Sequence, residues 1–179
     1  MSFKAPTDVE AAHDFLGRVH HVCPRDGEIG IFNRSHYEDV VTTYVLGLIT
    51  DKERRARTRM IRDFEHLLVS QGTTIVKVFL HISKDEQRER LQVRIDDPEK
   101  RWKFNPADLD ARAHWDNYQT AYAKAIEATS TAEAPWYVVP GDHKWVRNYA
   151  ASSLMVEVLE AMKPKLPPDP PGVEGIVIS

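Results

Sequence analysis

The sequence has only one cysteine and no long apolar run, and each of these absences excludes a class of protein. Cys23 is the single cysteine among 179 residues, so no disulfide can form within the chain and no thiol cluster can bind zinc or an iron–sulfur centre. The first residues lack the apolar run of a secretory signal, and no segment approaches the roughly 20 apolar residues of a membrane span. We therefore expect a cytoplasmic protein with no membrane partner.

Neither sign of charge is in large excess. The chain has 24 Lys and Arg residues against 27 Asp and Glu residues, which gives a formal net charge of -3 at pH 7. A protein without a general positive field is poorly suited to non-specific nucleic-acid binding. We expect no nucleic-acid partner, and any site for an anion must be local.

A glycine-rich phosphate loop is also missing. The pattern G-x-x-x-x-G-K-[ST] does not occur in the sequence, and none of the eight glycines lies in a loop that a strand precedes and a lysine closes. Backbone N–H groups in such a loop surround the phosphates of a bound nucleotide. The sequence therefore lacks the usual device for holding a nucleotide's phosphates.

The apolar pattern alternates between short strands and amphipathic helices. It predicts strands at 28–32, 73–82 and 136–140, and helices at 7–21, 37–69 with a break near 47–51, 83–97, 106–128 and 146–162. This order is typical of an α/β domain with a parallel sheet and helices on both faces. We expect one domain at 1–163, followed by a proline-rich, flexible tail at 164–179.

Two polar clusters are candidate sites. Six cations lie close together in the sequence: Arg88, Arg90, Arg94, Lys100, Arg101 and Lys103. Several of their guanidinium groups can converge on one polyanion, although the neighbouring acidic residues fit a solvated helix face equally well. Asn33 and Arg34 follow the strand predicted at 28–32, where phosphate-binding α/β folds place a magnesium-binding carboxylate. Asn33 adds no charge there, so a polar strand end is the alternative.

Four long strings carry a resemblance to a known family. They are G-E-I-G-I-F-N-R-S-H-Y-E-D-V (27–40), L-H-I-S-K-D-E-Q-R-E-R-L (80–91), D-D-P-E-K-R-W-K-F (96–104) and A-P-W-Y-V-V-P-G-D-H-K-W (134–145). With these strings, about 3–162 of the chain resembles the polyphosphate kinase 2 family. The resemblance implies a P-loop-kinase-like fold with a helical lid at about 83–105. It also implies Mg²⁺-dependent phosphoryl transfer between polyphosphate and a nucleoside mono- or diphosphate.

The resemblance also implies roles for individual residues. Asn33 and Arg34 match the family's second Walker motif, and Arg34 is expected to contact a phosphate. The lid cations are expected to close over the transferring group and neutralise its charge. The site residues implied in this way are Asn33, Arg34 and Arg94 for catalysis, and Arg57, Arg90, Lys100 and Lys103 for phosphate or substrate binding.

The sequence departs from the family pattern in two places. Family members begin with a strand and the glycine-rich Walker loop, whereas this sequence matches them only after that loop. The usual Arg and His are replaced by Tyr44 and Leu46, and a Trp by Arg54. We expect a chain that lacks the first strand and the P-loop and has impaired activity in isolation. The alternatives are a non-catalytic polyphosphate-binding protein, or a chain completed by a partner or a homo-oligomer.

Overall fold

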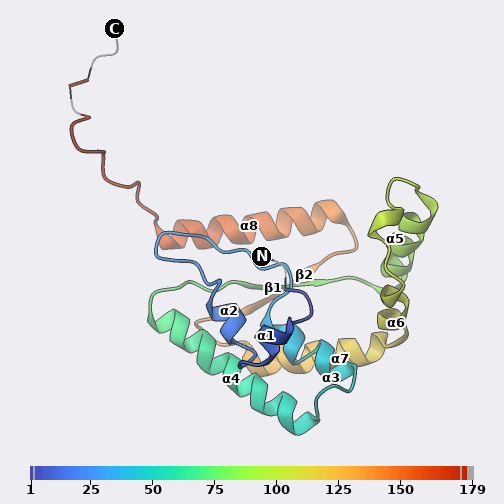
Figure 1. Cartoon of the computed structure of the whole chain (residues 1–179). Helices are drawn as coiled ribbons and strands as arrows, with labels where there is room; N and C mark the ends of the chain where they lie inside the picture. The colour runs from blue at the N-terminus through green and yellow to red at the C-terminus, as the bar shows by residue number, and fades with distance from the viewer. Residues whose placement is uncertain (2, 174, 177–179) are drawn as a thin grey trace.

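The computed structural model describes residues 1, 3–173, 175 and 176. Its sheet has two parallel strands, β1 (Lys77–His81) and β2 (Trp136–Pro140), paired in register along their whole length. Figure 1 shows α8 (Lys144–Met162) on one side of the strands, and α4 (Asp51–Ser70) with α7 (Trp115–Thr129) on the other. The predicted α/β fold with parallel strands and helices on both faces is confirmed.

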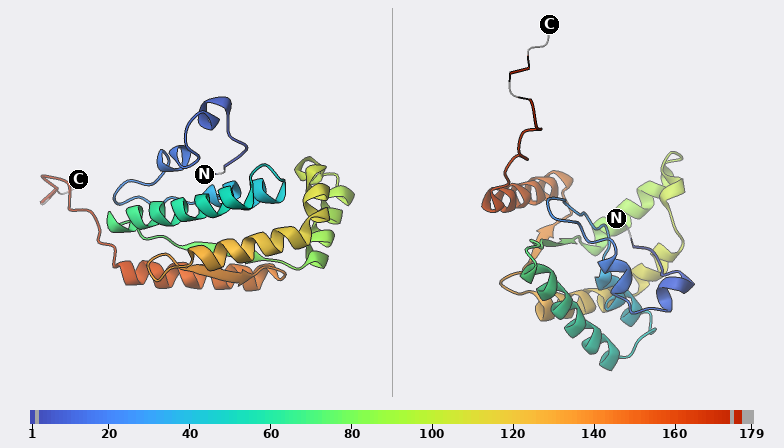
Figure 2. Two further views of the ribbon diagram at one scale, coloured as in Figure 1. Left: turned by 90° about the horizontal axis from the view of Figure 1, so that it is seen from below. Right: turned by 60° about the vertical axis from the view of Figure 1, so that its left-hand side comes forward.

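The connection from β1 to β2 is helical throughout most of its length. It contains α5 (Lys84–Asp96), the short 3₁₀ helix η2 (Arg101–Lys103) and α6 (Ala107–Ala113), and then α7. The single helix predicted over 106–128 is wrong, because His114 ends α6 and precedes α7 with a ψ of 21° that is not helical. Figures 1 and 2 show α5 and α6 standing together at one end of the molecule.

The first helix is shorter than the sequence predicts. Thr7 and Glu10 form a capping box at the start of α1 (Asp8–Ala11), but α1 ends after one turn, and α2 (Gly17–His20) follows separately. The Asp14 carboxylate accepts a hydrogen bond from the Leu16 N–H at 3.0 Å. Such a local side-chain bond competes with helical backbone bonding and separates the two helices.

The predicted break before the long helix is confirmed. After the 3₁₀ helix η1 (His36–Asp39) and α3 (Thr42–Val45), the chain leaves helical geometry until Thr50 caps α4. Gly47 lies in this break with a φ of 71°, a left-handed conformation that costs glycine little. The break turns the chain so that α4 runs back across the molecule.

The strand predicted at 28–32 is wrong. Ile29 and Ile31 are 67% and 74% exposed, and Asn33 forms only an isolated bridge, in which its N–H donates to the Met1 carbonyl at 2.7 Å. A strand needs a neighbour to satisfy its backbone N–H and C=O groups. Among the described residues, the backbone of this segment bonds only to Met1 and, in the preceding turn, to Arg25, so the segment is an extended loop.

The core consists of two apolar clusters between the helices. The larger surrounds Val40, Val41 and Ile61 and includes Ala121 and Ala125 of α7. The small alanine side chains let α7 approach α4 closely, while the partly buried Trp136 of β2 packs against the same cluster. The second cluster joins Phe3, Val19 and Phe64. The N-terminal segment is thus packed onto α4 rather than onto the sheet.

The chain after α8 is irregular and exposed throughout its described part, and Figure 1 shows it extending away from the body. Its predicted flexibility stays a prediction. No helix within the described residues is both long and apolar enough to cross a membrane.

Candidate functional site

The carboxyl ends of β1 and β2 are joined by a tight backbone contact. The Gly141 N–H donates to the His81 carbonyl at 2.7 Å, and the Asp142 carboxylate accepts the Ser83 N–H at 2.7 Å. A Cβ atom on Gly141 would lie 2.8 Å from Ile82 Cγ2, closer than real contacts allow. The hydrogen bond from Ser83 holds the pKa of Asp142 below its ordinary value. The start of α5 is therefore fixed to the end of β2.

Arg90 strengthens this connection about two turns further along α5. Its guanidinium donates to the Gly141 carbonyl with Nη2 and to the Glu86 carboxylate with Nε at 2.7 Å. Ser83 caps the same helix by accepting the Glu86 N–H at 3.1 Å. Arg90 therefore positions α5 on the sheet, and its guanidinium is largely engaged by these partners.

The helices α5 and α6 form a hairpin that carries most of the predicted lid cations. Arg94 on α5 pairs with Asp108 on α6 at 3.2 Å, and Arg112 on α6 donates to the Lys84 carbonyl at 2.6 Å. Side-chain contacts at two positions along α5 and α6 thus hold the two helices together. The hairpin covers the predicted lid segment, and it extends through α6 to Ala113, beyond the predicted end near 105.

The tip of this hairpin presents further cations to solvent. Lys100 pairs with Asp97 at 2.6 Å, which holds the pKa of Asp97 below its ordinary value. The Lys103 ammonium lies 5.0 Å from the ring centroid of Trp102, which is 78% exposed. This cation–π contact holds the Lys103 ammonium beside the exposed ring at the hairpin tip.

Asn33 and Arg34 lie outside the hairpin, just before η1. Arg34 has a φ of 65°, an uncommon left-handed conformation for a residue with a side chain. Its positive charge opposes the burial that raises the pKa values of Tyr118 and Tyr122 on α7. The Arg34 charge therefore lies near these two tyrosines of α7, and Gln119 of the same helix lies 3.2 Å from His81 at the end of β1.

Arg57, on α4, makes contacts within the chain that stabilise the fold. Its guanidinium donates to the Asp39 carbonyl at 3.1 Å and lies 5.1 Å from the ring centroid of Phe15. Arg18 pairs with the Asp39 carboxylate at 3.2 Å. These contacts hold the end of η1 against the N-terminal helices.

The predicted site residues therefore fall into three groups. Arg90, Arg94, Lys100 and Lys103 lie on the hairpin, Asn33 and Arg34 precede η1, and Arg57 lies within α4. No hydrogen bond or ion pair joins one group to another among the described residues. Their proposed roles toward a phosphate stay predictions.

The residues of this region do not form a resident magnesium site by themselves. Asn33 offers a neutral amide, and no group of three or more His, Cys, Asp or Glu side chains with metal-binding geometry occurs in the part of the chain that is described. Mg²⁺ prefers several oxygen ligands, usually including water and substrate phosphates. The Mg²⁺ implied by the resemblance finds no set of ligands here.

Sequence reasoning missed a buried polar cluster beneath η1. Lys77 on β1 pairs with Glu65 on α4 at 2.5 Å, and the Tyr37 hydroxyl donates to the same carboxylate at 2.7 Å. His36 is buried beside them, 3.5 Å from Glu65, and neither ring nitrogen has a hydrogen-bond partner among the described residues. A single lysine within the apolar run of 75–80 was the available signal.

Comparisons with known proteins give consistent results. Residues 1–167 match the sequence profile of the family described as Polyphosphate kinase 2 (PPK2). The chain is 53% identical to an AMP/ADP-polyphosphate phosphotransferase of Meiothermus ruber, over 99% of this chain and 66% of the relative. It is 43% identical to an ADP-polyphosphate phosphotransferase of Rhodopseudomonas palustris, over 95% of this chain and 63% of the relative.

A solved structure agrees with these sequence comparisons. The fold superposes on the crystal structure of polyphosphate kinase 2 from Arthrobacter aurescens with a TM-score of 0.91 and 48% identity. The match covers 94% of this chain and 60% of that one. The chain thus spans less than two-thirds of the length of each of these three relatives.

Proposed function

Because the chain belongs to the polyphosphate kinase 2 family, we propose that it transfers a phosphoryl group between inorganic polyphosphate and a nucleoside mono- or diphosphate. The observation that carries the proposal is the cation-bearing hairpin of α5 and α6, fixed by Arg90 to the joined ends of β1 and β2. In α/β folds, ligands bind beyond the carboxyl ends of the strands. The names of the Meiothermus and Rhodopseudomonas relatives support this substrate class.

The hairpin cations act by neutralising phosphate charge. Phosphoryl transfer depends mainly on positioning and on stabilising charge as it spreads over the phosphate oxygens. Arg94 exchanges Asp108 for a substrate phosphate, and Lys103 provides a second positive charge at the hairpin tip. Lys100 contributes when its exposed pair with Asp97 opens. Arg90 holds the base of the hairpin in position.

Arg34 contacts the phosphate as a further positive charge, from the segment just before η1. Its left-handed backbone directs the segment after Asn33 into η1. Mg²⁺, when bound, would supply positive charge to the phosphate substrates; the described residues include no cluster of ligands for it.

The isolated chain has impaired turnover, since its sequence has no glycine-rich loop to orient the phosphates. Two measurements on the 179-residue chain test the proposal: polyphosphate binding, and formation of ATP from ADP, polyphosphate and Mg²⁺. The full-length Meiothermus relative is the positive control. Turnover close to that of the relative would contradict the impaired activity of the isolated chain. Absence of both polyphosphate binding and turnover would contradict the proposed phosphotransferase function.

The alternative function is polyphosphate binding without catalysis, favoured by the same missing loop. Tight, salt-sensitive binding that is accompanied by no turnover, even at high protein concentration, supports this alternative. Completion by a partner chain or by a second copy stays a prediction. Concentration-dependent turnover, together with a dimeric mass in light scattering, supports it.

A further inference from the structure

A basic groove lies between α4 and α7, away from the helical hairpin. It is an open hollow of about 470 Å³ lined by eight residues: Arg54, Arg55, Thr58, Arg59, Arg62, Lys124, Glu127 and Ala128. Five of the eight are cations and one is an anion. None belongs to α5, η2 or α6, so this groove is separate from the cations to which the proposed function assigns roles.

The cations of α4 follow the helical repeat. Arg55, Arg59 and Arg62 are spaced by four and three residues, and all three are exposed, so they form one stripe along the helix. At about 1.5 Å per residue the stripe is roughly 10 Å long. A length of this order suits several successive anionic groups, whereas a single phosphate would contact only one or two of the side chains.

Most of the groove cations are not neutralised within the chain. Asp51 engages Arg54 and Arg55, each at 2.7 Å. Arg59, Arg62 and Lys124 have no ion pair within 4.0 Å among the described residues. Like charges three or four residues apart on a helix repel each other. This arrangement costs the folded chain stability unless an anion occupies the groove.

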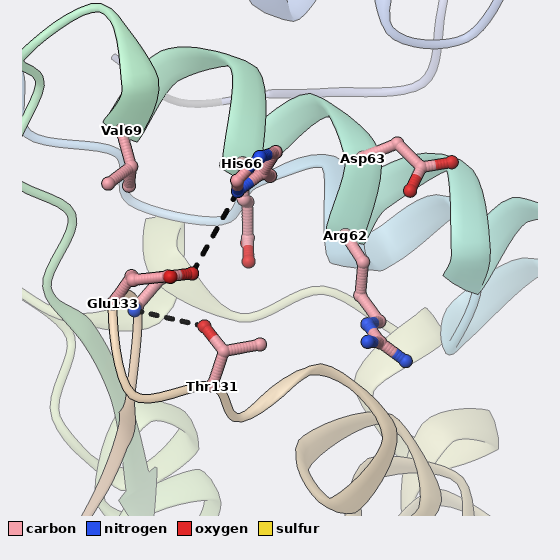
Figure 3. A pocket seen from close by; sticks show the side chains of 8 residues that line it. Arg62, Asp63, His66, Val69, Thr131 and Glu133 are labelled. Carbon is pink, nitrogen blue, oxygen red and sulfur yellow. Dashed lines mark hydrogen bonds and ion pairs between the residues drawn. The ribbon is translucent and has the colours of Figure 1, made fainter.

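One end of the groove has a different charge. Arg62 also lines an adjoining hollow of about 150 Å³, whose other walls include Glu133 and His66. Figure 3 shows Arg62 extending toward the segment after α7, while Asp63 turns away and His66 faces Glu133. His66 and Glu133 are 3.9 Å apart. The carboxylates limit the basic stripe at this end, so the anion extends from Arg62 toward Arg55.

We propose that the groove between α4 and α7 binds a segment of inorganic polyphosphate at a distance from the hairpin. Arginine suits this ligand, because its planar guanidinium can donate two parallel hydrogen bonds to phosphate oxygens. The choice of polyphosphate over another linear polyanion rests on the proposed function. While one end of a long polymer is bound at the hairpin, the groove binds another segment of the same polymer. Because that segment is tethered, its effective concentration at the groove is high, and the polymer is retained.

The test compares polyphosphate chains of two lengths on the whole 179-residue protein. Long-chain polyphosphate and tripolyphosphate are titrated against the unmodified chain, Arg59→Gln/Arg62→Gln, and Lys124→Gln on the opposite wall. The double variant is expected to bind the long chain about tenfold more weakly, which corresponds to about 1.4 kcal/mol. The affinity for tripolyphosphate stays within about twofold, because a short chain at the hairpin does not reach the groove.

The matched control is Lys163→Gln/Lys165→Gln, which removes the same charge from exposed positions outside the groove. An equal loss in this control would assign the effect to net charge and overturn the proposal. Equal weakening of both polyphosphate lengths, or no weakening, overturns it too. Far-UV circular dichroism verifies folding, and Lys124→Gln provides an independent readout from α7.

Two further comparisons distinguish binding at the groove from binding at the hairpin, and polyphosphate from other ligands. If Arg94→Gln/Lys103→Gln weakens binding of both lengths while Arg59→Gln/Arg62→Gln changes neither, the proposed function stands and the groove does not. If no variant or unmodified chain binds polyphosphate, the proposed function itself fails. A single-stranded oligonucleotide is titrated in the same way. If it binds as tightly as polyphosphate, and if Arg59→Gln/Arg62→Gln abolishes its binding, the assignment to polyphosphate is overturned.

Discussion

Lys77 Nζ lies 2.5 Å from Glu65 Oε2, and both side chains are almost fully buried between β1 and α4. Lys77 also donates to the Thr129 carbonyl at the end of α7, and Tyr37 donates to the second Glu65 oxygen. Burial lowers the pKa of Lys77, while the Glu65 carboxylate opposes that effect. One ion pair thus links a strand, two helices and η1 directly beneath the segment that carries Arg34.

Removing one partner of this pair is expected to destabilise the fold strongly. Lys77→Met leaves the Glu65 carboxylate buried with only the Tyr37 hydroxyl as a close donor, which typically costs about 3–5 kcal/mol. Urea unfolding followed by circular dichroism measures the change. The double variant Lys77→Met/Glu65→Leu removes both charges and should recover most of the loss. A cost below about 1 kcal/mol for the single variant would show that the pair is solvated.

Stability is expected to fall with rising pH above about pH 10. Burial raises the pKa values of Tyr37 and Tyr122 well above the ordinary value of 10.0. In that range the unfolded chain loses protons that the folded chain keeps, so the free energy of unfolding decreases. Each such tyrosine contributes a slope of about 1.4 kcal/mol per pH unit.

Tyr122→Phe isolates one part of this effect. The variant removes one of the retained protons, so its stability should decline less steeply between pH 10 and pH 11 than that of the unmodified chain. Comparing the two slopes cancels the contributions of the lysines and of the other tyrosines. Identical slopes would mean that Tyr122 ionises as readily in the folded chain as in the unfolded chain.

Local signals explain which parts of the fold were predictable from sequence. The caps at Thr7 and Ser83 each involve a glutamate three positions away, and they lie at the predicted helix starts of 7 and 83. The strand at 136–140 was predicted from its apolar run and agrees with β2. The run at 28–32 gave a similar signal, but a strand also needs a neighbouring strand, and that requirement is not encoded in the run itself.

Long-range partners explain what was missed at the candidate site. The contacts of Lys77 lie 12, 40 and 52 residues away in sequence, so its role could not be read from its neighbours. The spacing of the six cations indicated a cluster, and their role as a lid was implied by the family resemblance. That Arg90 donates to the Gly141 carbonyl, and so positions a helix, depends on a contact across 51 residues.

Gly141→Ala tests the close contact that fixes the base of the hairpin. The added methyl group would lie 2.8 Å from Ile82 Cγ2 and 3.1 Å from the His81 carbonyl oxygen, so overpacking should cost about 1–3 kcal/mol. Gly17→Ala is the control, because its nearest contact is an ordinary 3.4 Å to Asp14. That change should be neutral or stabilising by up to about 1 kcal/mol. Equal effects at both positions would remove the steric argument.

The pair of Arg94 and Asp108 separates a binding role from a structural one. Both side chains are more than one-third exposed, so breaking the pair should change stability by less than about 1 kcal/mol. Arg94→Gln and Asp108→Asn each break it but change the charge of the hairpin in opposite directions. If Arg94 binds phosphate, the first variant should weaken polyphosphate binding about threefold to tenfold, and the second should strengthen it. Titrations at two salt concentrations measure both effects, which should shrink as salt increases. If the pair serves only to join α5 to α6, both variants should weaken binding alike.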